Sequence, residues 1–135
     1  MGATKVIQKN LPKIKNSKDA SIVFFLTFEV QYGYNFHSQV SISKGAIEGL
    51  ASLLAAAFAP LIRVNTVAPS LTNTPLLGKL LNTPEKIATQ SEKTPLKRIV
   101  NTVDVAETAV CLLTPKSSWL SGQILHVDGG GSSLK

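Results

Sequence analysis

A single lysine, Lys44, lies near the start of a predicted helix and is the only fully charged residue between positions 30 and 47. One interpretation is an ion pair with Glu48, four residues later. A lysine that precedes a glutamate at this spacing is the weaker orientation, and it contributes only a few tenths of a kcal/mol. The pair therefore explains little of the isolation of Lys44, and a role in binding or catalysis comes into consideration.

A second candidate for proton chemistry, His37, lies seven residues before Lys44. The unperturbed pKa of a histidine is about 6.5, so its ring can exchange a proton near neutral pH. Val40, three residues after His37, has an aliphatic side chain that cannot. A histidine in a loop or at a helix N-cap, without a catalytic duty, is the alternative interpretation. We expect no metal site.

The helix that carries Lys44 is predicted over residues 38–59, from apolar positions at helical spacing. Past Glu48 it is apolar nearly all round, so either the domain or a partner must cover more than its sheet side. We therefore expect a homo-oligomer that associates through this helix. The other predicted elements are helices over 4–15 and 102–113, buried strands over 21–26, 62–69 and 123–127, a loop with a short helix over 70–81 and a polar stretch over 82–97.

The order of these elements alternates helix and strand, which predicts an α/β fold with a parallel sheet and right-handed crossovers. About three strands are present, whereas an open sheet normally contains about five or six. The first and last predicted strands look buried on both faces, yet they lack flanking strands within the chain. We expect that a part of the complete fold is missing.

The basic charge of the chain does not predict a nucleic-acid partner. The net charge is +6, from 14 lysines and arginines against 8 acidic residues. The lysines gather in the first segment without interleaved aromatic residues, and Lys5, Lys9 and Lys13 follow the spacing of one solvated helix face.

Two further features bear on the compartment. The single cysteine, Cys111, excludes an internal disulfide and fits a reducing environment. The longest uncharged apolar run, 49–62, has 14 residues, contains Pro60 and is too short to cross a bilayer. We expect a cytoplasmic protein without a membrane partner.

Six stretches of the sequence together resemble the short-chain dehydrogenase/reductase family. They are SIVFFLT, VSISKGAIEGLASLLAAAFAP, IRVNTVAPSLTNTP, PLKRI, DVAETAVCLL and SSWLSGQILHVDGGG, in this order. No single stretch would suffice, but the resemblance covers essentially the whole chain without a break, which makes it specific for the fold.

The resemblance implies a partial Rossmann-like fold, in which a parallel sheet lies between two layers of helices and NAD or NADP is bound. Such domains are about twice as long as this chain, so residues 1–135 are expected to be a single domain that is the C-terminal half of one. The glycine-rich turn that holds the cofactor pyrophosphate belongs to the other half. We therefore do not expect this chain alone to hold NAD or NADP.

In this family a Tyr-x-x-x-Lys pair stands at the start of the helix that corresponds to 38–59. The resemblance implies that Lys44 binds the nicotinamide ribose and lowers the pKa of the tyrosine, which is the general acid–base. Lys44 matches the lysine, but the tyrosine position is Val40. His37 is a weak substitute for the missing proton donor.

The resemblance also implies roles in two loops. The position of the family's catalytic serine falls on Thr27, whose hydroxyl could polarise a substrate carbonyl; a threonine that closes a strand is the alternative. PSLTNTP resembles the loop that holds the nicotinamide carboxamide, in which Pro69, Leu71 through its backbone, and Thr74 match. Ser70 replaces the usual glycine of that loop.

Two functions follow from these observations. The first is an NAD(P)-dependent oxidoreductase of a small carbonyl or alcohol substrate, impaired or inactive as this chain. The second is a non-catalytic assembly module derived from the same family. Loss of a positioned general acid costs roughly 10²- to 10⁴-fold in rate, so the valine at position 40 leaves activity an open question.

Overall fold

The computed structural model describes residues 2–26, 38–78 and 81–134 of the 135-residue chain. The elements are, in chain order, α1 (Gly2–Lys15), β1 (Ala20–Phe25), α3 (Ser38–Phe58), β2 (Ile62–Pro69), the 3-10 turn η1 (Pro75–Leu77), α4 (Pro84–Glu92), α5 (Thr102–Leu113), the 3-10 turn η2 (Pro115–Ser117) and β3 (Ile124–Val127). The predicted alternation of helices and strands is confirmed. The first and last strands were expected to be buried, but only β2 is buried along most of its length, whereas β3 is half-buried throughout.

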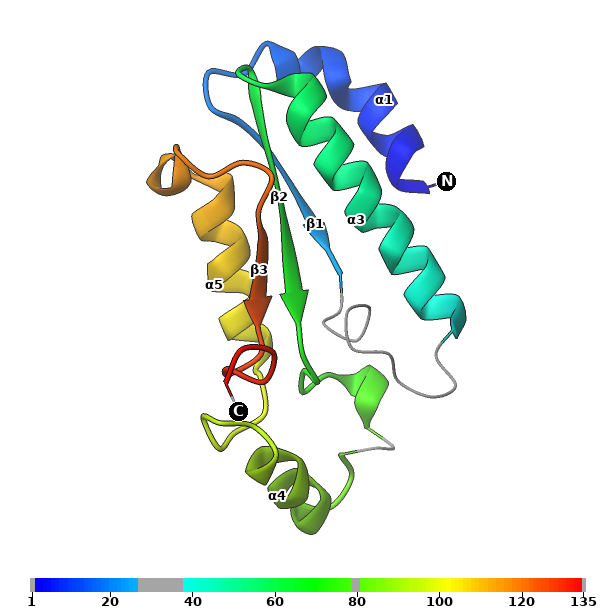
Figure 1. Ribbon diagram of the computed structural model, residues 1–135, viewed down its shortest axis with the longest axis vertical. Coiled ribbons are helices and arrows are strands. Elements are labelled where there is room, and N and C mark those ends of the chain that lie inside the picture. The colour runs from blue at the N-terminus through cyan, green and yellow to red at the C-terminus, as the bar shows by residue number, and fades with distance from the viewer. Residues whose placement is uncertain (1, 27–37, 79–80, 135) are drawn as a thin grey trace.

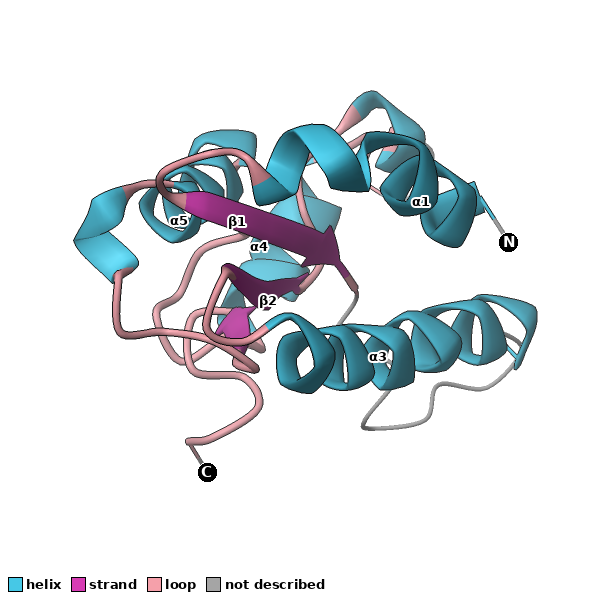
Figure 2. Ribbon diagram, turned by 90° about the horizontal axis from the view of Figure 1, so that it is seen from above, coloured by secondary structure: helices cyan, strands magenta, loops and turns pink. Residues whose placement is uncertain are grey.

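The strands form a parallel sheet in the order β1-β2-β3. Its register pairs Ala20 with Ile62 and Thr66 with Ile124. Helices α1 and α3 cover one face of the sheet and α5 covers the other, which gives the predicted three layers (Figures 1 and 2). The Rossmann-like α/β class is therefore confirmed, with three strands in the described part of the chain.

The two crossover connections have opposite hands. The strands step in one direction across the sheet, but α3 lies on one face and α5 on the other (Figure 2). The prediction that both crossovers are right-handed is therefore wrong. The rule rests on a helix that packs back directly from the preceding strand. Here residues 70–101, which contain α4, separate β2 from α5 and free α5 to reach the other face.

The core on the α3 face joins two helices to two strands. Ile7 of α1, Phe24 of β1, and Ala51 and Ala55 of α3 are buried against Val64 of β2. Alternate residues of the strands point to this face, as a pleated strand requires. This core fixes α3, and with it Lys44, against the sheet.

Hydrogen bonds of buried polar groups tie α5 and β3 to β2. The Arg63 guanidinium donates to the carbonyls of Leu112, Thr114 and Ser117, at and just after the C-terminal end of α5, where backbone carbonyls lack partners within the helix. The fully buried Asn65 side chain donates to the Leu120 carbonyl at 2.8 Å and accepts from the Gln123 amide at 3.0 Å. The two side chains fix the end of α5 and the start of β3.

A helix within the predicted polar stretch 82–97 was not anticipated. Thr83 has an extended backbone, its hydroxyl accepts from the Lys86 amide at 3.3 Å, and Pro84 occupies the first helical position. This is a normal helix start, which the sequence TPEK contains. Within the described residues, no helix has both the length and the apolar content that a membrane-spanning segment requires.

Candidate functional site

The three parallel strands end at one edge of the sheet (Figure 1). Lys44, on α3, reaches this edge. Its Nζ donates a hydrogen bond of 2.9 Å to the carbonyl of Phe25, the last residue of β1. Ligands of open α/β sheets bind outside the carboxyl ends of the strands. The ammonium therefore lies where the fold places a ligand.

A cavity of about 350 Å³ opens at the same edge, between the ends of β1 and β2 and the first turns of α5. Its lining is mostly apolar and consists of Phe25, Pro69, Thr72, Thr74, Thr102, Val105 and Ala106. Phe25 connects the cavity with the Lys44 ammonium, because it lines the cavity and its carbonyl accepts a hydrogen bond from Lys44. Lys44 itself does not line this cavity.

The loop after β2 is held close to the strand ends by its own hydrogen bonds. Thr72 forms a parallel bridge with Val100, and the Asn73 amide donates to the Val100 carbonyl at 2.9 Å. The Thr72 hydroxyl donates to the Ser70 carbonyl at 2.8 Å. Among the described non-glycine residues only Lys97 has a positive φ, so Ser70 makes this turn without backbone strain.

The predicted site residues fall into three groups. The structure brings Pro69 and Thr74 into one cavity, with Lys44 one hydrogen bond from its rim. Leu71 is half-buried and lies outside the cavity lining. The remaining predicted residues cannot be placed: Thr27 and His37 lie outside the described residues, and of Val40 only the backbone, in the first turns of α3, is described.

The sequence reasoning missed five of the seven residues that line this cavity: Phe25, Thr72, Thr102, Val105 and Ala106. Thr72 belongs to the quoted loop PSLTNTP, and alternation along that loop would have placed it near Thr74. Phe25 carries no chemical group that marks it. Its role follows from the position at which β1 ends beside α3, which only the structure shows.

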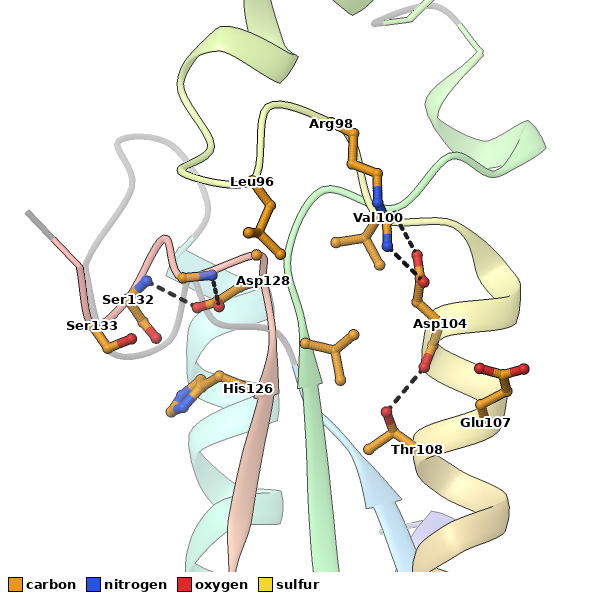
Figure 3. A pocket seen from close by; sticks show the side chains of 13 residues that line it. Leu96, Arg98, Val100, Asp104, Glu107, Thr108, His126, Asp128, Ser132 and Ser133 are labelled. Atoms are coloured by element: carbon orange, nitrogen blue, oxygen red, sulfur yellow. Dashed lines mark hydrogen bonds and ion pairs between the residues drawn. The ribbon is translucent and has the colours of Figure 1, made fainter.

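A second cavity, of about 570 Å³, lies between α5 and the chain after β3 (Figure 3). Among its lining residues, both terminal guanidinium nitrogens of Arg98 donate to the Asp104 carboxylate, at 2.6 and 2.8 Å. The Asn101 amide donates to the same carboxylate at 2.8 Å. The hydrogen bond from Arg98, together with that from Asn101, lowers the pKa of Asp104 to about 2.

On the opposite wall of this cavity, Asp128 is almost fully buried. Its carboxylate accepts from the Gly130 amide at 3.0 Å and the Ser132 amide at 2.9 Å. Burial raises the pKa of Asp128, but the hydrogen bonds from Ser132 and Gly130 and the nearby His126 outweigh burial, and the pKa lies below its usual value. The carboxylate therefore stays ionised at neutral pH.

Comparisons with known proteins identify this architecture. The family model described as enoyl-(acyl carrier protein) reductase matches residues 1–132. The peroxisomal 2,4-dienoyl-CoA reductase SPS19 of Saccharomyces cerevisiae is 35% identical over 132 residues, which cover 96% of this chain and 44% of that protein. The chain belongs to the short-chain dehydrogenase/reductase family. It spans about half the length of the curated relatives it matches.

Solved structures agree with this assignment. The ligand-free aldohexose dehydrogenase of Thermoplasma acidophilum superposes with a TM-score of 0.91 at 30% identity, over 97% of this chain and 55% of that chain. The protein ElxO, solved with NADPH bound, superposes with a TM-score of 0.87 at 25% identity, over 98% of this chain and 54% of that chain. In both cases about half of a larger domain is matched.

Proposed function

We propose that this chain supplies the C-terminal half of an NAD(P)-dependent oxidoreductase that acts on a small carbonyl or alcohol substrate, and that it does not catalyse the reaction by itself. The observation that carries the proposal is the hydrogen bond of 2.9 Å between Lys44 Nζ and the Phe25 carbonyl. It holds the one charged group of the helix start at the edge where the strands end. The NADPH bound to ElxO supports a nicotinamide cofactor for this family.

The residues present fit the nicotinamide end of such a cofactor. Lys44 would donate to the ribose hydroxyls, and Pro69, the Leu71 backbone and Thr74 would hold the ring and its carboxamide. The cavity of about 350 Å³ is at the small end for a ligand site, and it suits this end of the cofactor and not the whole dinucleotide. When bound, the nicotinamide supplies hydride transfer.

Two features of the sequence argue against oxidoreductase activity of this chain alone: the residue at position 40 and the lack of a pyrophosphate-binding stretch. Val40 cannot donate the proton that a reduced carbonyl needs, and the sequence contains no G-x-G-x-x-G stretch for the pyrophosphate. The chain alone is therefore expected to show no saturable binding of NADH or NADPH below the millimolar range by calorimetry. Saturable binding would contradict the non-catalytic part of the proposal.

The decisive test supplies both an upstream half, to which the pyrophosphate-binding turn belongs, and a tyrosine at position 40. The chain is fused behind the upstream half of the Saccharomyces cerevisiae relative, and NADPH oxidation is measured with a panel of aldehydes and ketones. In this fusion Val40→Tyr is expected to raise the rate by roughly 10²- to 10⁴-fold, because it restores a general acid one turn before the lysine. Adding Lys44→Met to this variant should abolish the gain. A fusion that folds but gains nothing from Val40→Tyr would reject the proposal.

A second candidate function, a non-catalytic assembly module, is supported by the outer side of α3. Leu53 is 66% exposed there, among exposed Ala46, Gly49 and Ala57. This exposed apolar surface fits association with a second copy of the chain through α3, and it requires no cofactor. A cytoplasmic location remains a prediction, which the single cysteine supports.

A further inference from the structure

The chain after β3 forms a compact turn, residues 128–132, which we call the glycine turn. Its amides at Gly130 and Ser132 donate to the buried Asp128 carboxylate. Gly129 has φ 61° and Gly130 has φ 88°, values that residues with a Cβ atom rarely adopt. The conformation of the turn therefore depends on glycine at positions 129 and 130.

The glycine turn contacts the segment that follows α4. The Leu96 amide donates to the Gly129 carbonyl at 3.2 Å. A Cβ atom at Gly129 would lie 2.6 Å from Cγ2 of Thr94, and one at Gly130 would lie 3.4 Å from Cβ of Pro95. The side chains of this segment therefore pack directly on the backbone of the turn, and a Cβ atom at position 129 would displace the Thr94 methyl group.

Helix α4 depends on such a contact because it has little other support. It contains no buried residue, and it lies beyond the strand ends, away from the sheet (Figure 1). After α4 ends at Glu92, the chain passes through Lys97, whose backbone is left-handed at φ 54° and whose amide donates to the Thr94 carbonyl at 2.8 Å. The segment 94–97 is therefore the place where the end of α4 is joined to the body of the molecule.

We propose that the glycine turn is a positioning anchor: Gly129, held by Asp128, fixes segment 94–97 and thereby sets the orientation of α4 relative to the strand ends. Leu96 and Asp128 both line the cavity of about 570 Å³, so the anchor also sets the shape of that cavity (Figure 3). The inference does not depend on cofactor binding or on catalysis by this chain.

Amide hydrogen exchange of the whole chain tests the anchor. Gly129→Ala is expected to raise exchange of residues 84–97 on the order of tenfold, because the added methyl displaces Thr94 and the end of α4 opens locally. The amides of β2, in the core, should exchange as in the unchanged protein. Increased exchange throughout β2 would mean general destabilisation and would reject a local anchor.

Gly122→Ala is the matched control. Gly122 also has a positive φ, of 74°, but a Cβ there would lie 3.7 Å from the Ala55 Cβ, an ordinary contact remote from α4. It therefore imposes the backbone strain without the clash, and exchange of residues 84–97 should not change. An equal increase in both variants would overturn the proposal.

A compensating change tests the contact directly. Thr94→Ser removes Cγ2 and keeps the hydroxyl, so in the Gly129→Ala background it should restore most of the slow exchange in α4. Should Gly129→Ala not fold, Asp128→Asn replaces it, because an amide can accept from only one of the two backbone donors. Unchanged exchange of α4 in Asp128→Asn, or no restoration by Thr94→Ser, would reject the anchor.

Discussion

At the scale of the residue, the carboxylate of Asp104 offers a clean test of electrostatics. It accepts two hydrogen bonds from Arg98 and one from the Asn101 amide, and its pKa lies at about 2. A folded-state pKa below the unfolded value of about 3.9 stabilises the fold above that pH, and the stabilisation is lost as the pH falls toward 2. We expect Asp104→Asn to lower the melting temperature at pH 7 and to have progressively less effect between pH 4 and pH 2.

Glu107→Gln is the control for this prediction, because it removes the same charge from the same helix. Glu107 is exposed, and we expect its replacement to change the melting temperature less than Asp104→Asn does at pH 7. Melting curves followed by circular dichroism at several pH values provide the measurement. A loss that stays constant from pH 7 to pH 2 in Asp104→Asn would show that the ionised carboxylate contributes nothing.

The candidate site could be predicted from sequence only where one residue type signals its chemistry. Lys44 is conspicuous in an uncharged stretch, and the loop that contains Pro69 and Thr74 has a distinctive order of residues. Phe25 and Thr72 have no such signal, because their contribution comes from the point at which β1 ends and from a bridge to Val100. Contacts of this kind depend on the packing of elements distant in the sequence.

At the scale of the element, two neighbouring buried polar residues of β2 should respond in opposite ways to removal of their polar groups. One replacement is expected to destabilise the fold and the other is not. Asn65→Ala leaves the Leu120 carbonyl and the Gln123 amide without their partner, and it should destabilise the protein by about 2–4 kcal/mol. The buried hydroxyl of Thr66 has no hydrogen-bond partner within the described residues, so Thr66→Val should be neutral or stabilising.

Urea denaturation of the two variants measures this contrast. The substitutions stand side by side on one strand, and both remove a buried polar group, so each serves as the control for the other. If Thr66→Val costs as much as Asn65→Ala, packing and not hydrogen bonding determines stability at this strand.

The elements themselves were mostly predictable, for identifiable reasons. Strand β2, Ile62–Pro69, and helix α5, Thr102–Leu113, begin and end where the sequence indicated, because each has continuous apolar spacing. Helix α4 was missed because no apolar stripe marks it, although Thr83 and Pro84 signal its start. The hand of the connection through α5 is a property of the whole sheet, which local patterns do not contain.

At the scale of the whole molecule, we predict that the chain associates through the outer side of α3. Sedimentation at several concentrations should show a dimer or a larger species. Leu53→Lys places a charge on this apolar surface and should shift the equilibrium to the monomer. Val110→Lys is the matched control, since Val110 is 58% exposed on α5, on the other face of the sheet.

Two outcomes would contradict this assembly. A well-folded chain that remains monomeric at all concentrations would reject it outright. Equal weakening by Leu53→Lys and Val110→Lys would show that association does not depend on α3. Loss of association in Leu53→Lys alone would support the second candidate function independently of any cofactor measurement.

The position of β1 at the margin of the sheet has a consequence for handling the protein. Within the described residues only β2 pairs with it, and its six residues, ASIVFF, contain no charge, proline or glycine. Segments of this composition with an open backbone edge are those that stack into amyloid-like fibrils. Lys15 and Lys18, just before the strand, are placed to repel such stacking, so neutralising these two ammonium groups should make warm, concentrated samples turn turbid sooner.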